Sequence, residues 1–394
     1  MRVVEIEAMI VRLNLRKEFK HASFNRKHSD NLIVRCRLAD GTEGWGEGIP
    51  RTYVTGESPE GAMSQIQATP LADQLDFDCS HWHDVIRLCD SYQPVVEEDD
   101  PRGCRANANR CAVELSLLDA FGRHFEQSTR QVIKHFEPAE SVTEFVERTQ
   151  YSGAVSSGSM RKETKSSLAM RLYGFRHCKV KVAMDPASDG QRLRNIRRWI
   201  GNRMDLRVDA NEAWRPDEVV KWIREMEPSN ISSVEQPVAH AEVESLAEAR
   251  REPFLPDIML DESLCSMFDA KRAIEHQTCD LFNIRLSKCG GLLNSLRIAA
   301  VARDAGLGYQ LGCHPGESGI LSAAGRHFAT SVRDIRYREG SADRHLVRDN
   351  ITVEDLSFGY GGRASAIDRP GLGFTIDPNA LEPLVQERRS FKLD

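Results

Sequence analysis

The sequence predicts an α/β protein in which a (β/α) barrel of the TIM type is joined to an α+β domain. The barrel is predicted by five short polar signatures between residues 179 and 291. They follow strand-like apolar runs at intervals of about 26 residues, as in a row of βα units. The α+β domain is predicted by residues 1–135, where strands are followed by helices without that alternation. Because the strand ends of a barrel converge on one face, the five signatures should lie together.

The N-terminal region is expected to begin with strands and continue with helices. Residues 1–15 have the pattern of a strand, and residues 32–47 alternate apolar and polar side chains as in a hairpin. Residues 58–136 are expected to be helical, most clearly over Ala106–Phe125, where apolar residues recur on one face. The polar segment Lys17–Asn31 is expected to be an irregular loop, and its residues leave open whether it is functional or only flexible.

Residues 136–345 are assigned to the barrel, and residues 346–394 to a tail that returns to the first domain. The tail contains two glycine-rich segments, 359–362 and 370–374, which are typical of turns around a returning strand. The barrel elements alternate between strands and helices. Strands are expected at 152–158, 177–182, 309–313 and 335–338, and helices at 166–173, 216–227 and 292–305.

The composition is typical of a soluble enzyme of about two domains, with 394 residues and a net charge of −6. No basic surface for nucleic acid is expected, and no apolar run approaches the roughly 18 residues of a membrane helix. Acidic residues interrupt the apolar N-terminus, which is unlike a secretory signal. Ten cysteines form no Cys-x-x-Cys pair, so buried, reduced thiols in a cytoplasmic protein are expected.

Three acids, Asp209, Glu235 and Asp261, each end a strand-like run. Held close together they would repel one another, and a divalent cation removes that cost. A ligand set made only of oxygen atoms selects a hard cation, usually Mg²⁺. The alternative is that these acids are helix N-caps or exposed strand ends. Three acids at regular spacing favour a site for one Mg²⁺ ion.

Lys179 and Lys181 should lie on the same side of a strand, because side-chain direction alternates. Like charges lower each other's pKa, which would bring one lysine towards the range of a general base. The alternative is an exposed strand edge, but residues 177–182 lie in the middle of the βα series. A lysine beside a cation held by three carboxylates is suited to removing a proton next to a substrate carboxylate.

Together these motifs resemble those of the enolase superfamily, in the muconate-lactonizing-enzyme (mandelate racemase/muconate cycloisomerase) subgroup. Segments 108–123 and 370–374 also resemble the capping-domain helix and the tail strand of that family. The matching motifs are Lys-x-Lys at 179–181, Asp-x-Asn at 209–211, Glu-Gln-Pro at 235–237, Asp-Glu-Ser at 261–263 and Gly-Gly at 290–291.

The resemblance implies a modified barrel with an α+β capping domain, which is built from the N-terminal region and the C-terminal tail. It implies that Asp209, Glu235 and Asp261 bind Mg²⁺. It also implies that Lys181 is the acid/base and that Lys179 stabilises the enolate. A small-molecule carboxylate substrate and a homo-oligomeric assembly are further expectations from the resemblance.

The first departure from the family pattern concerns the lysine on the opposite face of the substrate, where this chain has Arg285. Arginine is a poor base because its pKa lies above about 12. It could still stabilise an enolate electrostatically. Lys288 lies three residues further along and is expected on the opposite face of the strand. It could take over the task only if the strand rotated.

The second departure concerns residues 338–341, where dipeptide epimerases of the family have an Asp-x-Asp that holds a substrate ammonium group. Arg338 would favour a second anionic group if it faces the pocket, and a solvated strand end is the alternative. Glu317 is a candidate catalytic carboxylate. His314 is a candidate substrate-binding residue, although a lone histidine in a loop is more often structural.

The capping domain of this family places a loop over the barrel mouth, which makes Lys20, His21 and Arg26 candidate specificity residues. Their charge agrees with an anionic substrate, although solvation alone also favours charged loops. Asn211 and Glu262, which lie within two of the matching motifs, complete the candidate substrate-binding residues.

The primary hypothesis is a Mg²⁺-dependent isomerase or lyase that uses Lys181 as its one base for a proton α to a carboxylate. The reaction would be muconate-cycloisomerase-like, or a dehydration of the o-succinylbenzoate-synthase type. One alternative is an amino-acid or dipeptide racemase or epimerase in which Arg285 or Lys288 is the second base. Another is a barrel that keeps its metal site and acts only in binding.

Overall fold

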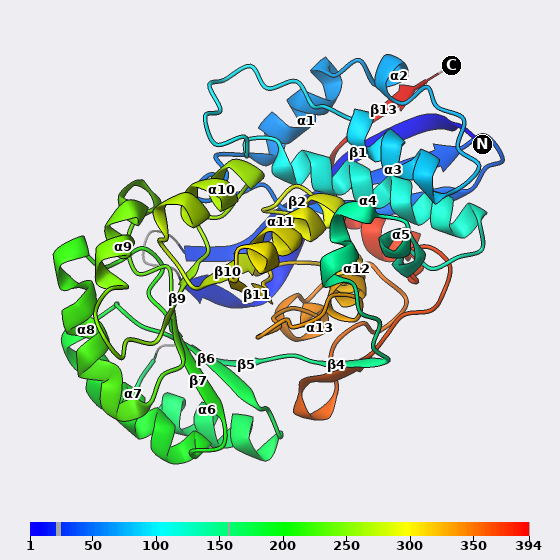
Figure 1. Ribbon diagram of the computed structural model, residues 1–394. Helices are drawn as coiled ribbons and strands as arrows, with labels where there is room; N and C mark the ends of the chain where they lie inside the picture. The colour runs from blue at the N-terminus through cyan, green and yellow to red at the C-terminus, as the bar shows by residue number, and fades with distance from the viewer. Residues whose placement is uncertain (21–24, 157, 394) are drawn as a thin grey trace.

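The computed structural model, which describes residues 1–20, 25–156 and 158–393, has the predicted two-part architecture (Figure 1). A curled parallel sheet with helices around it lies below an antiparallel sheet with its own helices. The seven parallel strands are neighbours in chain order. They are β5 (Gly153–Val155), β6 (His177–Lys181), β7 (Asp205–Asp209), β8 (Ser233–Glu235), β9 (Asp257–Leu260), β10 (Leu281–Ile284) and β11 (Gly308–Leu311).

An extended segment, residues 337–339, joins the two edges of the parallel sheet. Leu311 of β11 donates to this segment at 3.0 Å and accepts from it at 2.8 Å, backbone to backbone. At the other edge, the N–H of Ser152 donates to the carbonyl of Arg338 at 2.7 Å. The segment takes the place of the strand predicted at 335–338. It closes the barrel, although it pairs with β11 only through a single isolated bridge between Leu311 and Arg338.

Helices follow the strands and cover the outside of the barrel (Figure 1). In α8 (Val219–Met226) the residues Val219, Ile223 and Met226 are buried, which is the spacing of one helix face. The three predicted barrel helices are confirmed, with the middle one divided into 3₁₀ turns and α8. The other helices here are α6 (Met160–Leu172), α7 (Pro186–Ile200), α9 (Leu246–Ala249), α10 (Met267–His276), α11 (Leu292–Asp304), α12 (Gly319–Ala329) and α13 (Asp343–Leu346).

The capping domain is built on an antiparallel sheet of order β13-β1-β2-β3, so the tail pairs with the first strand. The returning strand is β13 (Val385–Lys392). The turn predicted at 370–374 is confirmed, because Gly371 and Gly373 have positive φ and turn the chain, whereas the tail strand that the family resemblance implied at this segment lies later in the chain, in β13. The other elements are β1 (Val3–Lys20), β2 (Asn25–Leu38), β3 (Glu43–Gly48), α1 (Pro59–Ala68), α2 (Leu71–Gln74), α3 (Trp82–Ser91), α4 (Asn107–His124) and α5 (Arg130–Lys134).

The segment Lys17–Asn31 belongs largely to a long hairpin, and not to the irregular loop that its polarity predicts. β1 continues to Lys20 and β2 begins at Asn25, and the two strands pair with two shifts of register, one of them between Asn14 and Phe19. Polar side chains do not prevent this pairing, because the two backbones satisfy each other's hydrogen bonds. Residues 21–24 lie outside the described part of the chain.

Helix α4 attaches the capping domain to the barrel. Glu114 accepts the first two N–H groups of α11, at 2.5 and 3.2 Å. The side-chain amide of Asn107 donates to backbone carbonyls in the loops that follow β9 and β10, at 2.6 and 2.7 Å. A β-carbon on Gly291, where φ is 111°, would lie 2.5 Å from the Glu114 carboxylate. The Gly-Gly motif therefore permits the close approach of the two domains.

The ten cysteines are all free thiols, and nine of them are buried, in agreement with their predicted use as small apolar residues. Among the helices of the described residues, none has the length and apolarity needed to cross a membrane.

Candidate active site

Three acidic side chains lie at the carboxyl ends of β7, β8 and β9. Asp209 is the register partner of Glu235, and Asp261 follows the end of β9. All three are buried. Gln236 links β8 to the next loop, because its side-chain carbonyl accepts the backbone N–H groups of Asp261 at 2.9 Å and of Ser263 at 3.1 Å. The Glu-Gln-Pro motif therefore positions the Asp-Glu-Ser motif.

Lys179 of β6 lies among three carboxylates. Its Nζ is 2.8 Å from Glu339, 3.2 Å from Glu235 and 3.5 Å from Asp209. Burial alone would lower the pKa of Lys179, but these carboxylates raise it above its usual value. For Lys179, the prediction of a pKa lowered by the neighbouring lysine is therefore wrong. This lysine remains charged, which suits stabilisation of an enolate better than proton abstraction.

Asp261 is contacted by two cations that follow β10. The guanidinium of Arg285 touches its carboxylate, and Lys288 Nζ donates to it at 2.8 Å. Burial would raise the pKa of Asp261, but these two charges lower it to about 2. The prediction that Arg285 and Lys288 face opposite ways is wrong. The chain has left the strand and turns, with the N–H of Cys289 bonded to the Arg285 carbonyl at 2.9 Å.

Glu262 adds a fourth buried carboxylate, and we refer to it with Asp209, Glu235 and Asp261 as the acidic cluster. Its Oε1 accepts the side-chain amide of Asn211 at 3.4 Å, whereas its Oε2 has no hydrogen-bond partner among the described residues. Burial and the charges of Asp261 and Asp209 raise the pKa of Glu262 well above its usual value. A hard divalent cation satisfies such a set of oxygen atoms.

The acidic cluster fits Mg²⁺ in its chemistry, but its side chains are engaged with cations of the protein. Within the described residues, no group of three His, Cys, Asp or Glu side chains has the spacing of a metal site. Arg285 lies against Asp261, and Lys179 lies against Glu235. A metal ion at this position would compete with these two basic side chains for the carboxylate oxygens.

Lys181 lies beside the acidic cluster. It is two residues beyond Lys179 on β6, so both side chains leave the same side of the strand. Lys181 Nζ donates to the side-chain oxygen of Asn211 at 2.6 Å. Asn211, where φ is 46°, also bonds Asp209 through its backbone N–H at 3.1 Å. Asn211, which we expected to bind substrate, thus holds the candidate base against the acidic cluster.

The loop after β11 contributes His314 and Glu317. His314 is 2% exposed, and neither ring nitrogen has a hydrogen-bond partner within the described residues. Burial, together with the charges of Arg285 and Arg51, lowers the pKa of His314 well below its usual value. Glu317 accepts the backbone N–H of His314 at 2.6 Å, and burial raises its pKa to about 8. Glu317 and Glu339 line a small cavity of about 10 Å³.

The structure describes the side chain of only one of the three candidate specificity residues on the capping hairpin. His21 lies outside the described residues, and Lys20 is described by its backbone alone, at the end of β1. Arg26 of β2 has its guanidinium carbon 5.8 Å from the ring centre of Tyr53. Arg26 is therefore next to the loop that follows β3, on the capping side of the barrel.

The comparisons with known proteins agree with this geometry. Residues 160–380 match the family model described as enolase C-terminal domain-like. The chain belongs to the enolase superfamily. One relative is the N-succinyl-L-Arg/Lys racemase of Bacillus cereus, 26% identical over 390 residues that cover 98% of each chain. Another is the L-Lys-D/L-Arg epimerase of Methylococcus capsulatus, 30% identical over 380 residues that cover 95% of this chain and 99% of that one.

Solved structures of enolase-superfamily enzymes have the same fold. The Bacillus cereus N-succinyl Arg/Lys racemase has a TM-score of 0.85 at 25% identity, covering 99% of this chain and 100% of that one. The Cytophaga hutchinsonii dipeptide epimerase, complexed with Mg and D-Ala-L-Val, has a TM-score of 0.84 at 26% identity, with the same coverage. The prediction of an enolase-superfamily isomerase or lyase is confirmed. The relatives are racemases and epimerases, and they do not support muconate-cycloisomerase chemistry in particular.

Two charged residues of this enolase-superfamily site, Arg207 and Glu339, were not predicted as site residues from the sequence. Arg207, in the middle of β7, is fully buried and donates to Glu339 at 2.6 Å. The sequence signal was a charge within an apolar strand, Leu206-Arg207-Val208, which implies a buried partner. The neighbouring residue Arg338 leaves the opposite side of the extended segment from Glu339, because side chains alternate. Arg338 is therefore not brought to the acidic cluster.

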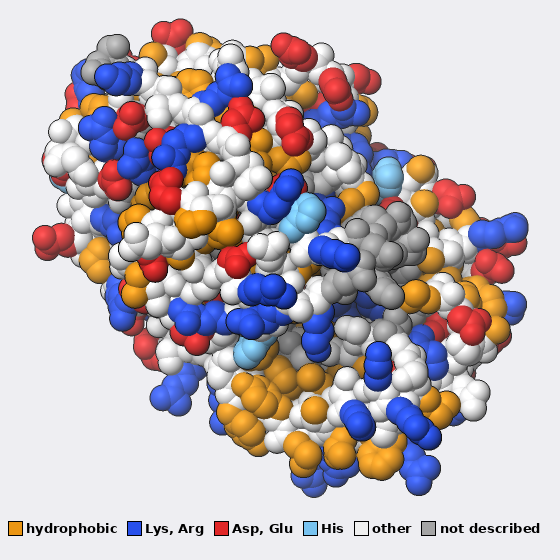
Figure 2. Space-filling view, turned by 180° about the vertical axis from the view of Figure 1, so that it is seen from behind, with side chains coloured by type: hydrophobic (Ala, Val, Ile, Leu, Met, Phe, Trp, Pro, Cys, Tyr) orange, Lys and Arg blue, Asp and Glu red, His pale blue; other side chains and the backbone are white. Residues whose placement is uncertain are grey.

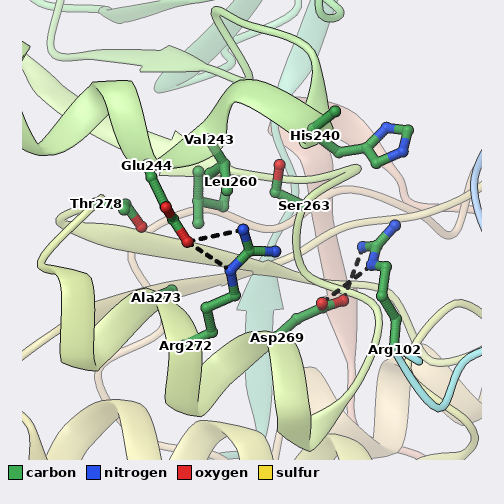
Figure 3. A pocket seen from close by; sticks show the side chains of 11 residues that line it. Arg102, His240, Val243, Glu244, Leu260, Ser263, Asp269, Arg272, Ala273 and Thr278 are labelled. Atoms are coloured by element: carbon green, nitrogen blue, oxygen red, sulfur yellow. Dashed lines mark hydrogen bonds and ion pairs between the residues drawn. The ribbon is translucent and has the colours of Figure 1, made fainter.

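A separate pocket lies outside the barrel strands, between α10 and the 3₁₀ turn His240–Ser245 (Figure 3). Across it, Arg272 pairs with Glu244 at 2.8 Å and Arg102 pairs with Asp269 at 2.7 Å. These charged side chains satisfy one another. Among the described residues, buried polar atoms without a hydrogen-bond partner include the hydroxyl of Thr278, which lines this pocket, and atoms of Glu262 and His314 at the barrel mouth.

Proposed function

We propose that this chain removes or adds a proton α to a substrate carboxylate, with Lys181 as the base. The observation that supports this most directly is the bond of 2.6 Å from Lys181 Nζ to Asn211, which holds the amine beside the acidic cluster. Lys179, kept charged by Glu235 and Glu339, would stabilise the enolate.

We further propose that Asp209, Glu235 and Asp261 bind one Mg²⁺ ion. Bound Mg²⁺ supplies positive charge that offsets the negative charge left on the substrate when the proton departs. Oε2 of Glu262, which has no hydrogen-bond partner within the described part of the chain, supports a cation at this position. A further support is the Cytophaga hutchinsonii epimerase, a structural neighbour whose complex contains Mg.

A single base is proposed because neither candidate for a second base is able to accept a proton readily. Burial would lower the pKa of Arg285, but the charges of Asp261 and Glu235 raise it well above its usual value. Lys288 Nζ donates to three oxygen atoms of Asp261 and Asn283, and its pKa is also raised by Asp261 against the effect of burial. One-base chemistry suits a cycloisomerisation or an elimination.

A racemase or epimerase is the second candidate, and the identities of the relatives favour it. Such a reaction needs a proton delivered to the opposite face of the substrate. Arg285 stands at the family position of that second group, and it would have to serve as a proton donor while paired with Asp261.

The test is exchange of the α-proton in deuterated water, followed by NMR and chiral chromatography. The substrates are N-acyl amino acids, dipeptides, muconolactones and sugar acids. We expect Mg²⁺-dependent exchange with retention of configuration, reduced about 10²- to 10⁴-fold or more in Lys181→Ala. Lys165→Ala, at an exposed position of α6, is the matched control and should exchange normally. Exchange with inversion would favour the racemase, and full turnover by Lys181→Ala would exclude Lys181 as the base.

A further inference from the structure

The helices α6 and α7, on the outside of the barrel, expose positive charge without exposed negative charge. Six of their Lys and Arg side chains are exposed, whereas the only acids of the two helices, Glu163 and Asp189, are buried. Both acids are paired with Arg192 of α7, so they do not offset the charge at the surface. The six exposed cations, which we call the basic face, are Arg161, Lys162, Lys165, Arg171, Arg194 and Arg198.

The basic face is one continuous surface, because α6 and α7 pack side by side. The side-chain amide of Asn195 in α7 donates to the hydroxyl of Thr164 in α6 at 3.0 Å. Near the C-terminal ends of both helices, the guanidinium of Arg171 is 3.5 Å from where a β-carbon on Gly201 would stand. The cations of the two helices therefore face the same region of solvent.

Apolar side chains project from among these cations. Leu168 and Leu172 lie seven and eleven residues after Arg161, which places them on the same side of α6. Leu172 is 68% exposed. Tyr360, whose hydroxyl donates to the carbonyl of Leu172 at 3.0 Å, is 62% exposed. On α7, the exposed indole of Trp199 is next to Arg198 in the chain. Side chains this exposed protrude from the surface and do not line a groove.

The basic face is local, because the whole chain has a net charge of −6. Residues 160–203 contain twelve Lys and Arg but three acids. The helices α6 and α7 lie at the bottom of Figure 1, away from the capping domain. In the same part of Figure 2, Lys and Arg side chains lie beside hydrophobic ones, with few acidic side chains between them. The surface is therefore distinct from the barrel mouth.

The cations of the basic face are not compensated by the protein. Within the described part of the chain, no member of the basic face forms an ion pair with an acid. Like charges on one surface repel each other, and their summed potential attracts an extended anion. A partner with many negative charges in a plane would match them all at once.

We propose that the basic face docks on the surface of an anionic lipid bilayer, with Leu172 and Tyr360 inserted among the lipid headgroups. The Lys and Arg side chains would contact lipid phosphates, while the apolar side chains would contact the upper part of the acyl chains. Docking by the side of the barrel leaves its mouth open. The inference is independent of the proposed function.

The mixture of side chains favours lipid over the other polyanionic partners. Nucleic acid would use the cations but would leave the exposed leucines in water. The core of a protein interface is depleted of charged residues. Here Leu168 has Lys165 and Arg171 as its neighbours on the helix surface, so the apolar side chains form no charge-free core. Aliphatic, aromatic and long cationic side chains occur together at the headgroup level of a membrane.

The experiment measures sedimentation of the full chain with vesicles of phosphatidylcholine, or of equal parts of phosphatidylcholine and phosphatidylglycerol. Each Lys or Arg near an anionic membrane raises the partition coefficient about fivefold. At low ionic strength we expect partitioning at least about 100-fold stronger into the mixed vesicles. Physiological salt, with a Debye length of about 8 Å, should weaken it. Equal binding to both kinds of vesicle, or binding to neither, would overturn the proposal.

Charge reversal tests whether the basic face is the docking surface. Arg194→Glu combined with Arg198→Glu should lower the partition coefficient for mixed vesicles about 25-fold or more. The matched control is Arg251→Glu combined with Lys271→Glu, which makes the same change of charge at exposed positions outside the basic face. It should bind within about twofold of wild type, because distant charges are screened. Equal losses in the two variants would show that net charge, and not the basic face, governs binding.

The apolar contribution is tested separately. Leu168→Ser combined with Leu172→Ser should weaken binding to mixed vesicles about 10-fold or more, because less apolar surface enters the headgroup layer. It should leave the salt dependence unchanged, since the cations remain. An unchanged partition coefficient would overturn the insertion of these side chains.

Two further measurements distinguish lipid from the other partners. A duplex oligonucleotide, followed by fluorescence anisotropy at the same ionic strength, should bind more weakly than the mixed vesicles do. Light scattering should give the same molar mass for wild type and for Arg194→Glu combined with Arg198→Glu. Tighter binding of the oligonucleotide would assign the basic face to nucleic acid. A lower molar mass of the variant would assign it to a contact between copies of the chain. Either result would overturn docking on lipid.

Discussion

At the scale of single residues, the buried charges of the barrel form a continuous series. Arg207 bonds Glu339, Glu339 contacts Lys179, and Lys179 contacts Glu235 of the acidic cluster. A buried charge is stable only while it is paired, so the removal of one member leaves its neighbours uncompensated. Glu339 is the carboxylate between two cations of the series, so its removal leaves both Arg207 and Lys179 with one partner fewer.

The first prediction concerns Glu339→Gln, which removes the carboxylate between Arg207 and Lys179. We expect the free energy of unfolding to fall by about 3–5 kcal/mol, measured by urea denaturation without added metal. The matched control is Glu382→Gln, whose pair with Arg388 at 2.6 Å is exposed. That variant should lose less than about 1 kcal/mol. Similar losses in the two variants would show that the buried series does not stabilise the barrel.

Residue spacing could predict some of the site and not the rest. Asp209, Glu235 and Asp261 could be placed together, because parallel strands bring their carboxyl ends to one edge. The spacing could not predict that Arg285 and Lys288 both contact Asp261. Strand alternation no longer applies after β10, where the chain turns. A pattern of side chains predicts direction only while the backbone conformation is regular.

At the scale of elements, the barrel strands and helices were predictable because each has its own apolar periodicity. The hairpin of β1 and β2 was not, since its outer part is polar and has no apolar alternation, although its two backbones pair. The tail strand was misplaced for a related reason. β13 is exposed along most of its length and lacks an apolar pattern, whereas its register with β1 comes from the tertiary fold.

The contact between α4 and α11 gives a prediction about pH. Glu114 caps the N-terminus of α11, and burial raises its pKa to about 8, from about 4.5 for an ordinary glutamate. The folded state therefore holds this proton more tightly than the unfolded state. The resulting stability is complete below about pH 4.5 and is lost as the pH rises towards about 8.

Glu114→Gln keeps the acceptor oxygen but cannot titrate, so its stability should depend less on pH than that of wild type. Urea denaturation between pH 5 and 8 should show a difference in slope of up to about 1.4 kcal/mol per pH unit. Glu137→Gln, at an exposed position, should keep the wild-type slope. Parallel curves for wild type and Glu114→Gln would show that Glu114 binds its proton equally in both states.

At the scale of the whole molecule, the acidic cluster joins segments that are distant in sequence. Its members follow three barrel strands, and Gln236 fixes the loop that also receives Asn107 from the capping domain. A cation bound by Asp209, Glu235 and Asp261 would therefore stabilise the barrel and its junction with the capping domain together. It would bind the folded chain only, because the three ligands are far apart in the unfolded chain.

The last prediction follows from this linkage. Mg²⁺ should raise the free energy of unfolding by about 2.7 kcal/mol at a concentration 100-fold above its Kd, and chelation should reverse the effect. Asp261→Asn removes one ligand charge and should abolish most of the increase, whereas Asp217→Asn, at an exposed pair with Arg215, should retain it. Arg285→Met removes the side chain that competes for Asp261 and should bind Mg²⁺ more tightly by calorimetry. An increase that is equal in wild type and Asp261→Asn would mean that Mg²⁺ acts elsewhere on the protein.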